Sequence, residues 1–397
     1  MKRLKLFLTG VLLFISLLLV AQDSCHVKIS LITLSPGDEI YTVFGHSGLR
    51  VKDSSGNQDL IYGYGTFDFN EPNFLMKFIN GKLLYYLSNE DYLPFINYYR
   101  NENRTIVEQE LNFTCEEKEK ILRYLFNNLQ GENKFYKYDF IYDNCTTRLR
   151  DLIETNTSKP VEYKRIVNNN ATFRMLLHSD LNYHDHQWLK LGIDILLGSG
   201  TDKKMNDKQV MFLPDYLMTT LGTGVVTNKH LVLKKKILSV GEGASSNKLS
   251  IANPFPIFLL FAVIVLFLTL LDHSRINNIL ERLDALLFFL VGLTGLVLIY
   301  LWAFSDQLNY RNNFNLLWAL PTHLIFSFLI FKEKPFIKNY FKINAVLYAL
   351  LLFVWFYLPQ QLNYSLIPLI VLMMVRSAIR GFNLDVKSLY GKKEFKL

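Results

Sequence analysis

The stretch Tyr142-Asp-Asn-Cys-Thr-Thr-Arg-Leu-Arg-Asp-Leu-Ile153 decides how the soluble part of this chain is interpreted. Asn144 is a good N-cap residue and apolar residues recur on one side, so the pattern predicts an amphipathic helix that begins at Cys145. Unpaired amides and the helix dipole favour an anion there, which lowers the pKa of a thiol toward the reactive thiolate. Arg148 shares this face and is a candidate for attracting an anionic substrate. A buried structural cysteine is the alternative interpretation.

A second stretch, Tyr41-Thr-Val-Phe-Gly-His-Ser-Gly-Leu-Arg-Val51, supplies a histidine that could act with this thiol. A hairpin sequence and a returning apolar run follow it, so the pattern predicts a strand with His46 at its head. The glycines on either side let other groups approach the ring. An imidazole beside Cys145 would lower the thiol pKa further and could protonate a leaving group. A structural histidine within a turn is the alternative.

The ends of the 397-residue chain differ in character from residues 26–250, which have a soluble, mixed α/β sequence. Residues 1–22 begin with Met1-Lys-Arg-Leu-Lys5 and continue as an apolar run, which is typical of a secretory signal peptide. An uncleaved signal anchor is the alternative, and both export the residues that follow. Of the three cysteines, Cys25 and Cys115 could pair in an oxidising compartment, which leaves Cys145 as a thiol.

Five apolar runs follow the soluble part, and several approach the roughly 20 residues that cross ~30 Å of hydrocarbon. Such runs have no polar face to present to water, which argues against soluble helices. We therefore predict an all-α bundle of five transmembrane helices. The five runs are Phe255–Leu271, Leu283–Phe304, Phe314–Phe331, Ala345–Leu358 and Leu366–Ile379.

The net charge of +8 is interpreted as a topology signal and not as a nucleic-acid-binding surface. Lys and Arg concentrate in the loops after the first and third runs and in the tail after the fifth. The loops on the other side hold Arg311 alone. By the positive-inside rule, the basic loops and the C-terminus are cytoplasmic, and the soluble part lies outside.

Polar residues gather at the outer ends of the second and third runs, on the same side as the soluble part. An ordinary interfacial loop is one interpretation, and a site for a polar substrate at the membrane surface is the other. His323 stands inside an apolar run, where an ionisable group is costly and often functional. The candidates for substrate binding here are Asp306, Asn312, Asn315 and His323.

The order of these motifs resembles the circularly permuted papain-like proteins, in which the histidine precedes the cysteine. These include the NlpC/P60-like amidases and the lecithin:retinol acyltransferase-like enzymes. The chain is more closely similar to the Lnb-type lipoprotein N-acyltransferase family, which joins a periplasmic cysteine domain to a polytopic membrane domain. The stretches that carry this resemblance are Leu34–Val51, Tyr62–Phe69, Tyr142–Leu152, Leu196–Lys203 and Phe212–Tyr216.

The resemblance implies an α+β permuted papain-like (NlpC/P60-like) domain at 23–250 and a five-helix transmembrane domain with a cytoplasmic tail at 251–397, in the bacterial inner membrane. It implies Cys145 as nucleophile and His46 as base. The orienting residue is open among Tyr62, Tyr64 and Asp68, with Tyr62 preferred. The implied reaction moves an acyl chain from phospholipid, through a Cys145 thioester, to the α-amino group of a lipoprotein's N-terminal cysteine. It needs no metal or cofactor.

Asn144 and the amide of Cys145 are candidate donors to the oxyanion of such a reaction. Two rival functions stay open. A peptidoglycan amidase or peptidase would use the same pair and need the membrane part only as an anchor, and a receptor or scaffold would need neither residue. If water resolves the thioester, the enzyme is a phospholipase. Five apolar runs exceed what an anchor needs, which favours handling of lipid.

Overall fold

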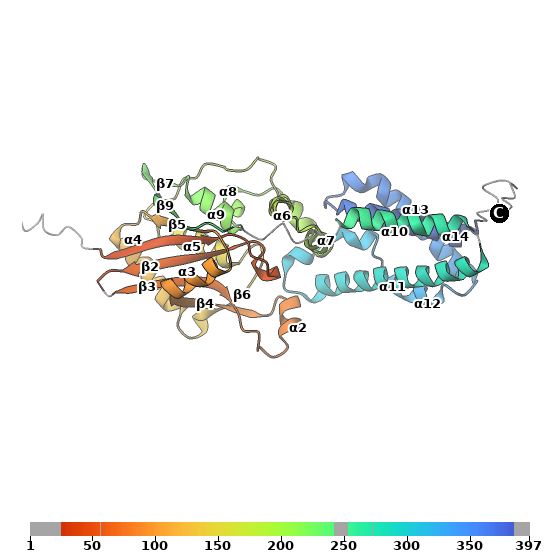
Figure 1. Ribbon diagram of the computed structural model, residues 1–397, viewed down its shortest axis with the longest axis horizontal. Helices are drawn as coiled ribbons and strands as arrows, with labels where there is room; N and C mark the ends of the chain where they lie inside the picture. The colour runs from red at the N-terminus through yellow and green to blue at the C-terminus, as the bar shows by residue number, and fades with distance from the viewer. Residues whose placement is uncertain (1–24, 56, 242–252, 272, 385–397) are drawn as a thin grey trace, which may run out of the picture.

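The computed structural model describes residues 25–55, 57–241, 253–271 and 273–384. The predicted signal peptide and the predicted domain boundary at residue 250 lie outside these ranges. The described part is elongated, with a sheet and its helices at one end and a helical bundle at the other (Figure 1). The soluble part is therefore α+β and the C-terminal part all-α, as predicted, whereas the permuted papain-like arrangement stays a prediction.

The soluble part is built on a seven-stranded sheet in the order β6-β4-β3-β2-β1-β5-β9, and every neighbouring pair is antiparallel. The interior strand β1, rich in Ile and Leu, is buried over its last six residues because both faces of the sheet are covered. The strands are β1 (Val27–Leu34), β2 (His46–Asp53), β3 (Gln58–Thr66), β4 (Leu84–Asp91), β5 (Ile106–Leu111), β6 (Phe135–Lys137) and β9 (Val232–Ser239). β7 (Val225–Val226) and β8 (Lys229–His230) form a separate hairpin.

Helices cover the two faces of this sheet. One face packs against α4 (Cys115–Asn128) and α5 (Cys145–Asn156), which share a core with Leu31 and Leu49. The other packs against α3 (Tyr92–Asn101), whose Phe95 joins Leu34. The remaining helices of the soluble part are α2 (Phe74–Ile79), α6 (Phe173–Tyr183), α7 (Gln187–Leu196), α8 (Asp207–Val210) and α9 (Pro214–Leu221).

Three helices of the described C-terminal part are long and apolar enough to cross a membrane. They are α11 (Ser274–Phe304), α13 (Pro335–Val354, continued by a 3-10 turn to Tyr357) and α14 (Ile367–Phe382, preceded by a 3-10 turn from Tyr364). The helix α10 (Pro254–Leu270) is shorter, at 17 residues. The prediction of five spans is thus not confirmed.

The third predicted run is the one that differs most from a spanning helix. Residues 314–331 form a short 3-10 turn, an interruption at 318–321, and α12 (Thr322–Leu329). Eight residues of helix reach only about 12 Å, far less than the hydrocarbon thickness. Pro321 stands directly before α12, where its missing amide hydrogen prevents continuation of the preceding turn.

A polar seam joins the soluble part to the membrane part. Gly198 N–H donates to Asn309 O at 2.8 Å, and a Cβ on Gly198 would lie 1.9 Å from Arg311 O, so only glycine fits there. Behind it, the fully buried Arg174 donates to Asp194 at 2.6 Å, and Asn363 of the membrane part donates to the same carboxylate at 2.8 Å. The Leu196–Lys203 stretch therefore docks the two parts together.

Candidate active site

Cys145 is the first residue of α5, as the sequence predicted, and the side chain of Asn144 caps that helix. Asn144 Oδ1 accepts hydrogen bonds from the amides of Thr146 and Thr147 at 2.8 and 2.9 Å. Its Nδ2 group donates to Phe140 O at 2.7 Å and to Phe212 O at 3.0 Å. Every polar atom of this buried amide is thus used to hold the helix start and the two segments beside it.

His46, at the head of β2, contacts the thiol of Cys145, which is partly exposed. Burial raises the pKa of this thiol, but the charge and hydrogen bond of His46 and the backbone amide of Ser47 outweigh burial and lower the pKa below its ordinary value. Gly45, before His46, has φ +77° and a Cβ there would lie 2.5 Å from Leu34 O. This glycine is therefore required where the chain turns into β2.

Two glycines of β3 leave room for the side chains of His46 and Cys145. A Cβ on Gly63 would lie 3.5 Å from His46 Nε2, and a Cβ on Gly65 would lie 3.5 Å from the Cβ of Cys145. The register of β3 against β4 shifts between Gly63 and Thr66, and Gly65 has φ +97°. The chain therefore departs from a regular strand at Gly65, where it passes close to Cys145.

The segment before Cys145 is also held from several sides. Tyr138 is partly buried beside the thiol, and its ring stacks on Tyr85 at 4.4 Å between centroids. Burial, followed by the charge of Cys145, raises the pKa of Tyr138 well above its usual value, so this phenol stays neutral. Asp139 Oδ1 accepts from the amides of Ile141 and Tyr142, both at 2.9 Å, which shapes the turn that leads to the nucleophile.

The guanidinium of Arg148 is already paired with neighbouring side chains. It makes a double hydrogen bond to Asp143 at 2.6 and 2.8 Å, and its guanidinium lies 3.5 Å from the centre of the Tyr136 ring. These contacts hold the turn before α5. Its predicted role in binding an anionic substrate stays a prediction that this geometry does not favour.

Tyr62 lies on β3 opposite Leu49 and packs with it against the main core. Cys145 packs against the same core. Tyr64 belongs to the same core and donates to Asn128 at 3.4 Å. The orienting role proposed for Tyr62 stays a prediction.

The polar cluster of the membrane part is distributed over three places. Asp306 pairs with Lys137 at 2.8 Å on the surface, and Asn312 O accepts from the amide of Ser199 at 3.1 Å in the seam. Asn315 is fully buried and donates to Asp194 O at 2.8 Å. His323 is fully buried in the bundle between the hydroxyls of two tyrosines, at 2.5 and 2.6 Å. Of the four, Asp306 and Asn312 are exposed, whereas Asn315 and His323 are fully buried and cannot meet a substrate in this structure.

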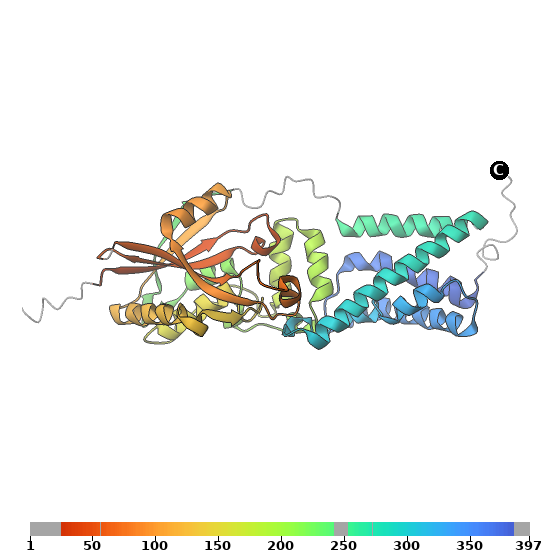
Figure 2. The same cartoon turned by 90° about the horizontal axis from the view of Figure 1, so that it is seen from below.

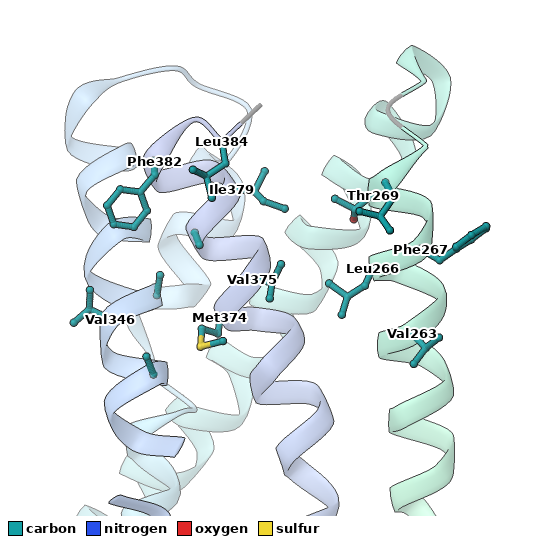
Figure 3. A pocket seen from close by; sticks show the side chains of 14 residues that line it. Val263, Leu266, Phe267, Thr269, Val346, Met374, Val375, Ile379, Phe382 and Leu384 are labelled. Carbon is teal, nitrogen blue, oxygen red and sulfur yellow. The ribbon is translucent and has the colours of Figure 1, made fainter. Parts of the chain in front are cut away.

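A large apolar crevice of about 710 Å³ lies far from this pair. It is lined by α10, α13 and α14, with Leu266, Met374 and Phe382 among its side chains (Figure 3). These residues lie toward the C-terminal ends of α10 and α14, at the end of the bundle away from the sheet (Figure 2). The crevice therefore does not serve the pair Cys145 and His46. Within the described ranges, no group of three or more His, Cys, Asp or Glu side chains is placed to hold a metal.

Cys145 carries a free thiol. Cys25 is also a free thiol, so the disulfide to Cys115, which rested on the count of cysteines alone, is not formed in the structure. The residues that sequence reasoning missed at the site are Ser47, Gly63, Gly65 and Tyr138. The alternating glycines of Tyr62-Gly-Tyr-Gly-Thr66 were a usable signal, because glycine within a strand often marks a bulge or a close approach. Nothing in the sequence singled out Tyr138.

A helix-start cysteine with a contacting histidine, in a domain fastened to a helical bundle with candidate membrane spans, defines a membrane protein with a cysteine–histidine site. Residues 19–179 match the family model of the Lnb N-terminal periplasmic domain, and residues 245–386 match that of the Lnb transmembrane domain. The chain therefore belongs to the Lnb-type lipoprotein N-acyltransferase family, with a periplasmic domain followed by a membrane domain. No curated protein and no solved structure matches it. Membership suggests a membrane enzyme that modifies lipoproteins.

Proposed function

We propose that the protein transfers an acyl chain from a phospholipid to the N-terminal amine of a lipoprotein through a thioester on Cys145. The observation that carries this proposal is the contact of His46 with a thiol of lowered pKa, at a helix start that is fastened to the membrane part. A thiolate poised in this way attacks an ester carbonyl, and a membrane domain in direct contact brings lipid esters within reach.

In the first step, the Cys145 thiolate forms a bond to the ester carbonyl carbon of the donor. The tetrahedral intermediate collapses, the ester C–O bond breaks, and the departing alkoxide takes a proton from the imidazolium of His46. The products are a thioester and a lysophospholipid. The first amides of α5 favour the developing oxyanion, and that of Cys145 is our candidate donor because Asn144 already occupies those of Thr146 and Thr147.

In the second step, the α-amino group of a lipoprotein's lipidated N-terminal cysteine attacks the thioester carbonyl. His46 takes the proton of the amine, the C–S bond breaks, and an amide and the Cys145 thiolate result. A transferase must hold the amine and exclude water, since water at the same carbonyl yields a free fatty acid. We place the protein in the inner membrane of a bacterium, with its C-terminus in the cytoplasm.

The test follows the acyl chain through both steps. Full-length protein in nanodiscs is incubated with phospholipid labelled in its acyl chains, and hydroxylamine-sensitive label on Cys145 is mapped by mass spectrometry. A diacylated lipopeptide is then added. We expect label to move to the lipopeptide amine, and an N-acetylated lipopeptide to receive none. Cys145→Ala should take up no label, whereas Cys25→Ala should behave like the parent.

Two results would assign another function, and a third would exclude the cysteine mechanism. Label that is released only as free fatty acid identifies a phospholipase. No label on Cys145 of the parent, with cleavage of peptidoglycan fragments, identifies the amidase. Full transfer by Cys145→Ala excludes a cysteine enzyme.

A further inference from the structure

An exposed apolar surface is formed by α2, the loop before it and the 3-10 turn Ile40–Thr42. A chain in water seldom exposes so many large apolar side chains in one contiguous patch. Its rings form a continuous set: the centroids of Tyr41 and Phe69 are 6.3 Å apart, those of Phe69 and Phe74 are 5.3 Å apart, and those of Phe74 and Phe78 are 6.1 Å apart. We name it the α2 surface, and its exposed members are Ile40, Tyr41, Phe69, Leu75, Met76 and Phe78, each at least half exposed.

The α2 surface is fastened to the end of a membrane span. Ser305 Oγ donates to Ile79 O at 3.3 Å, and the amide of Asp306 donates to Asn80 O at 2.9 Å, directly after α11 ends at Phe304. Both cartoon views place α2 beside this end of α11 (Figures 1 and 2). The last 20 or so residues of α11 suffice to cross the ~30 Å of hydrocarbon, so Phe304 marks the outer edge of that layer.

The same surface continues inward to the nucleophile. Phe67 packs on Phe74 at 5.9 Å and on Tyr85 at 5.1 Å, and Tyr85 stacks on Tyr138, whose ring lies beside Cys145. An unbroken aromatic wall therefore runs from the exposed α2 surface to the thiol. An acyl chain that follows such a wall stays out of water along the way.

We propose that the α2 surface inserts into the outer leaflet of the bilayer and is the port through which a phospholipid ester reaches Cys145. The occupant is lipid, because the surface is held beside the end of a span, and the exposed Lys82, which follows α2, offers a cation to lipid phosphates. Insertion is independent of the reaction at Cys145, whereas the role as a port rests on the function proposed above.

Insertion is tested by photo-crosslinking with full-length protein in nanodiscs of phosphatidylethanolamine and phosphatidylglycerol. A benzophenone amino acid replaces Leu75 or, as a control, Leu93 of α3. The two leucines are matched in exposure, at 65% and 66%. We expect crosslinks to lipid from position 75 at least about tenfold above position 93, and equal yields from the two positions would overturn insertion.

The port is tested by the rate at which Cys145 is acylated. In Leu75→Glu we expect acylation from bilayer phospholipid to slow by about tenfold or more, since a charge there opposes insertion. Acylation by monomeric dihexanoyl phosphatidylcholine and alkylation by iodoacetamide should keep the parent rate, and Leu93→Glu should match the parent throughout. An unchanged rate from bilayers, or an equal loss with the soluble ester, would overturn the port.

The two arms separate this inference from the proposed function. If the parent forms no acyl-enzyme from any ester, the proposed function fails and the port fails with it. The crosslinking comparison still decides whether the α2 surface lies in lipid.

Discussion

The thiol of Cys145 is subject to two opposed influences. Burial raises its pKa, and the contact with His46, helped by the amide of Ser47, lowers it by more. The thiolate is thus present at a lower pH than for an ordinary cysteine, and it is lost as the pH falls through this lowered pKa. Contact with His46 therefore makes Cys145 more reactive at a given pH than an ordinary cysteine.

We predict that His46→Ala raises the pKa of Cys145, because the partner that opposes the effect of burial is gone. The pH profile of iodoacetamide alkylation, read from the Cys145 peptide by mass spectrometry, should move to higher pH. At neutral pH the rate should fall by about tenfold, which corresponds to one unit of pKa. The exposed His230 gives the control His230→Ala, which should keep the parent profile. An unmoved profile in His46→Ala would show that His46 does not lower the pKa of Cys145.

A graded substitution at Gly63 tests the space around the imidazole. A methyl group there would sit 3.5 Å from His46 Nε2, an ordinary contact, so Gly63→Ala should retain most activity. The branched side chain in Gly63→Val should displace the ring and slow Cys145 acylation by about a hundredfold, as misplacement by ~1 Å does. Gly192→Val is the control, because a Cβ there meets nothing within 4 Å. Equal rates in the two Gly63 variants would contradict this account.

At this scale the sequence predicted Cys145 at a helix start and His46 at a strand head, because an N-cap before a cysteine and a turn before a strand are local patterns. Gly65 escaped prediction, since its contact with Cys145 depends on a bulge that shifts the register of two strands. Arg148 was assigned to substrate because its pairing with Asp143 and the Tyr136 ring could not be read from spacing.

Among the elements, the connection between α11 and α12 has the most direct link to the site. Gln307 Nε2 donates to Tyr138 O at 2.6 Å, and Asn309 Nδ2 donates to Asp139 Oδ1 at 3.1 Å. Both acceptors belong to the turn that ends at Cys145. A loop of the membrane part therefore positions the backbone before the nucleophile.

We predict that Asn309→Ala slows Cys145 acylation by a few-fold to about tenfold, since one hydrogen bond is worth about 0.5–1.5 kcal/mol. Thermal stability should change little. Asn313→Ala is the matched control. Asn313 binds Ile195 O and Leu196 O in the same seam without touching the turn, so its loss should lower the melting temperature and leave the rate unchanged. If Cys145 is acylated in Asn309→Ala at the parent rate, the turn keeps its shape without this hydrogen bond.

The elements themselves were predictable to different degrees. The helices that begin at Cys115 and Cys145 follow their capping residues, Thr114 and Asn144. The third apolar run is not one continuous helix, which hydropathy does not register, and the interruption before Pro321 leaves only a short α12. Asn315 was read as a surface residue, yet it is fully buried where the two parts meet, and a contact between separate parts has no local signature.

For the whole molecule, the distribution of basic residues predicts the orientation. Reporter fusions truncated after Lys334 should read cytoplasmic, and those truncated after Gln307 should read periplasmic, because basic loops are retained inside. Phosphatase and fluorescent-protein reporters give opposite signals for the two sides, which provides the internal control. A reversed pattern would place Cys145 on the cytoplasmic side, away from any exported lipoprotein.

Ser305 and Asp306, directly after α11, are hydrogen-bonded to Ile79 and Asn80, and these bonds fix the height of the soluble part above the membrane. Since the end of a span is joined directly to the domain that holds Cys145, the height of the sulfur above the hydrocarbon is a constant of the structure. A bilayer that is too thick or too thin shifts the glycerol esters away from that height, at a cost of fractions of a kcal/mol per Å. Acylation should therefore pass through an optimum as the chains of the host lipid are lengthened, with the donor held the same.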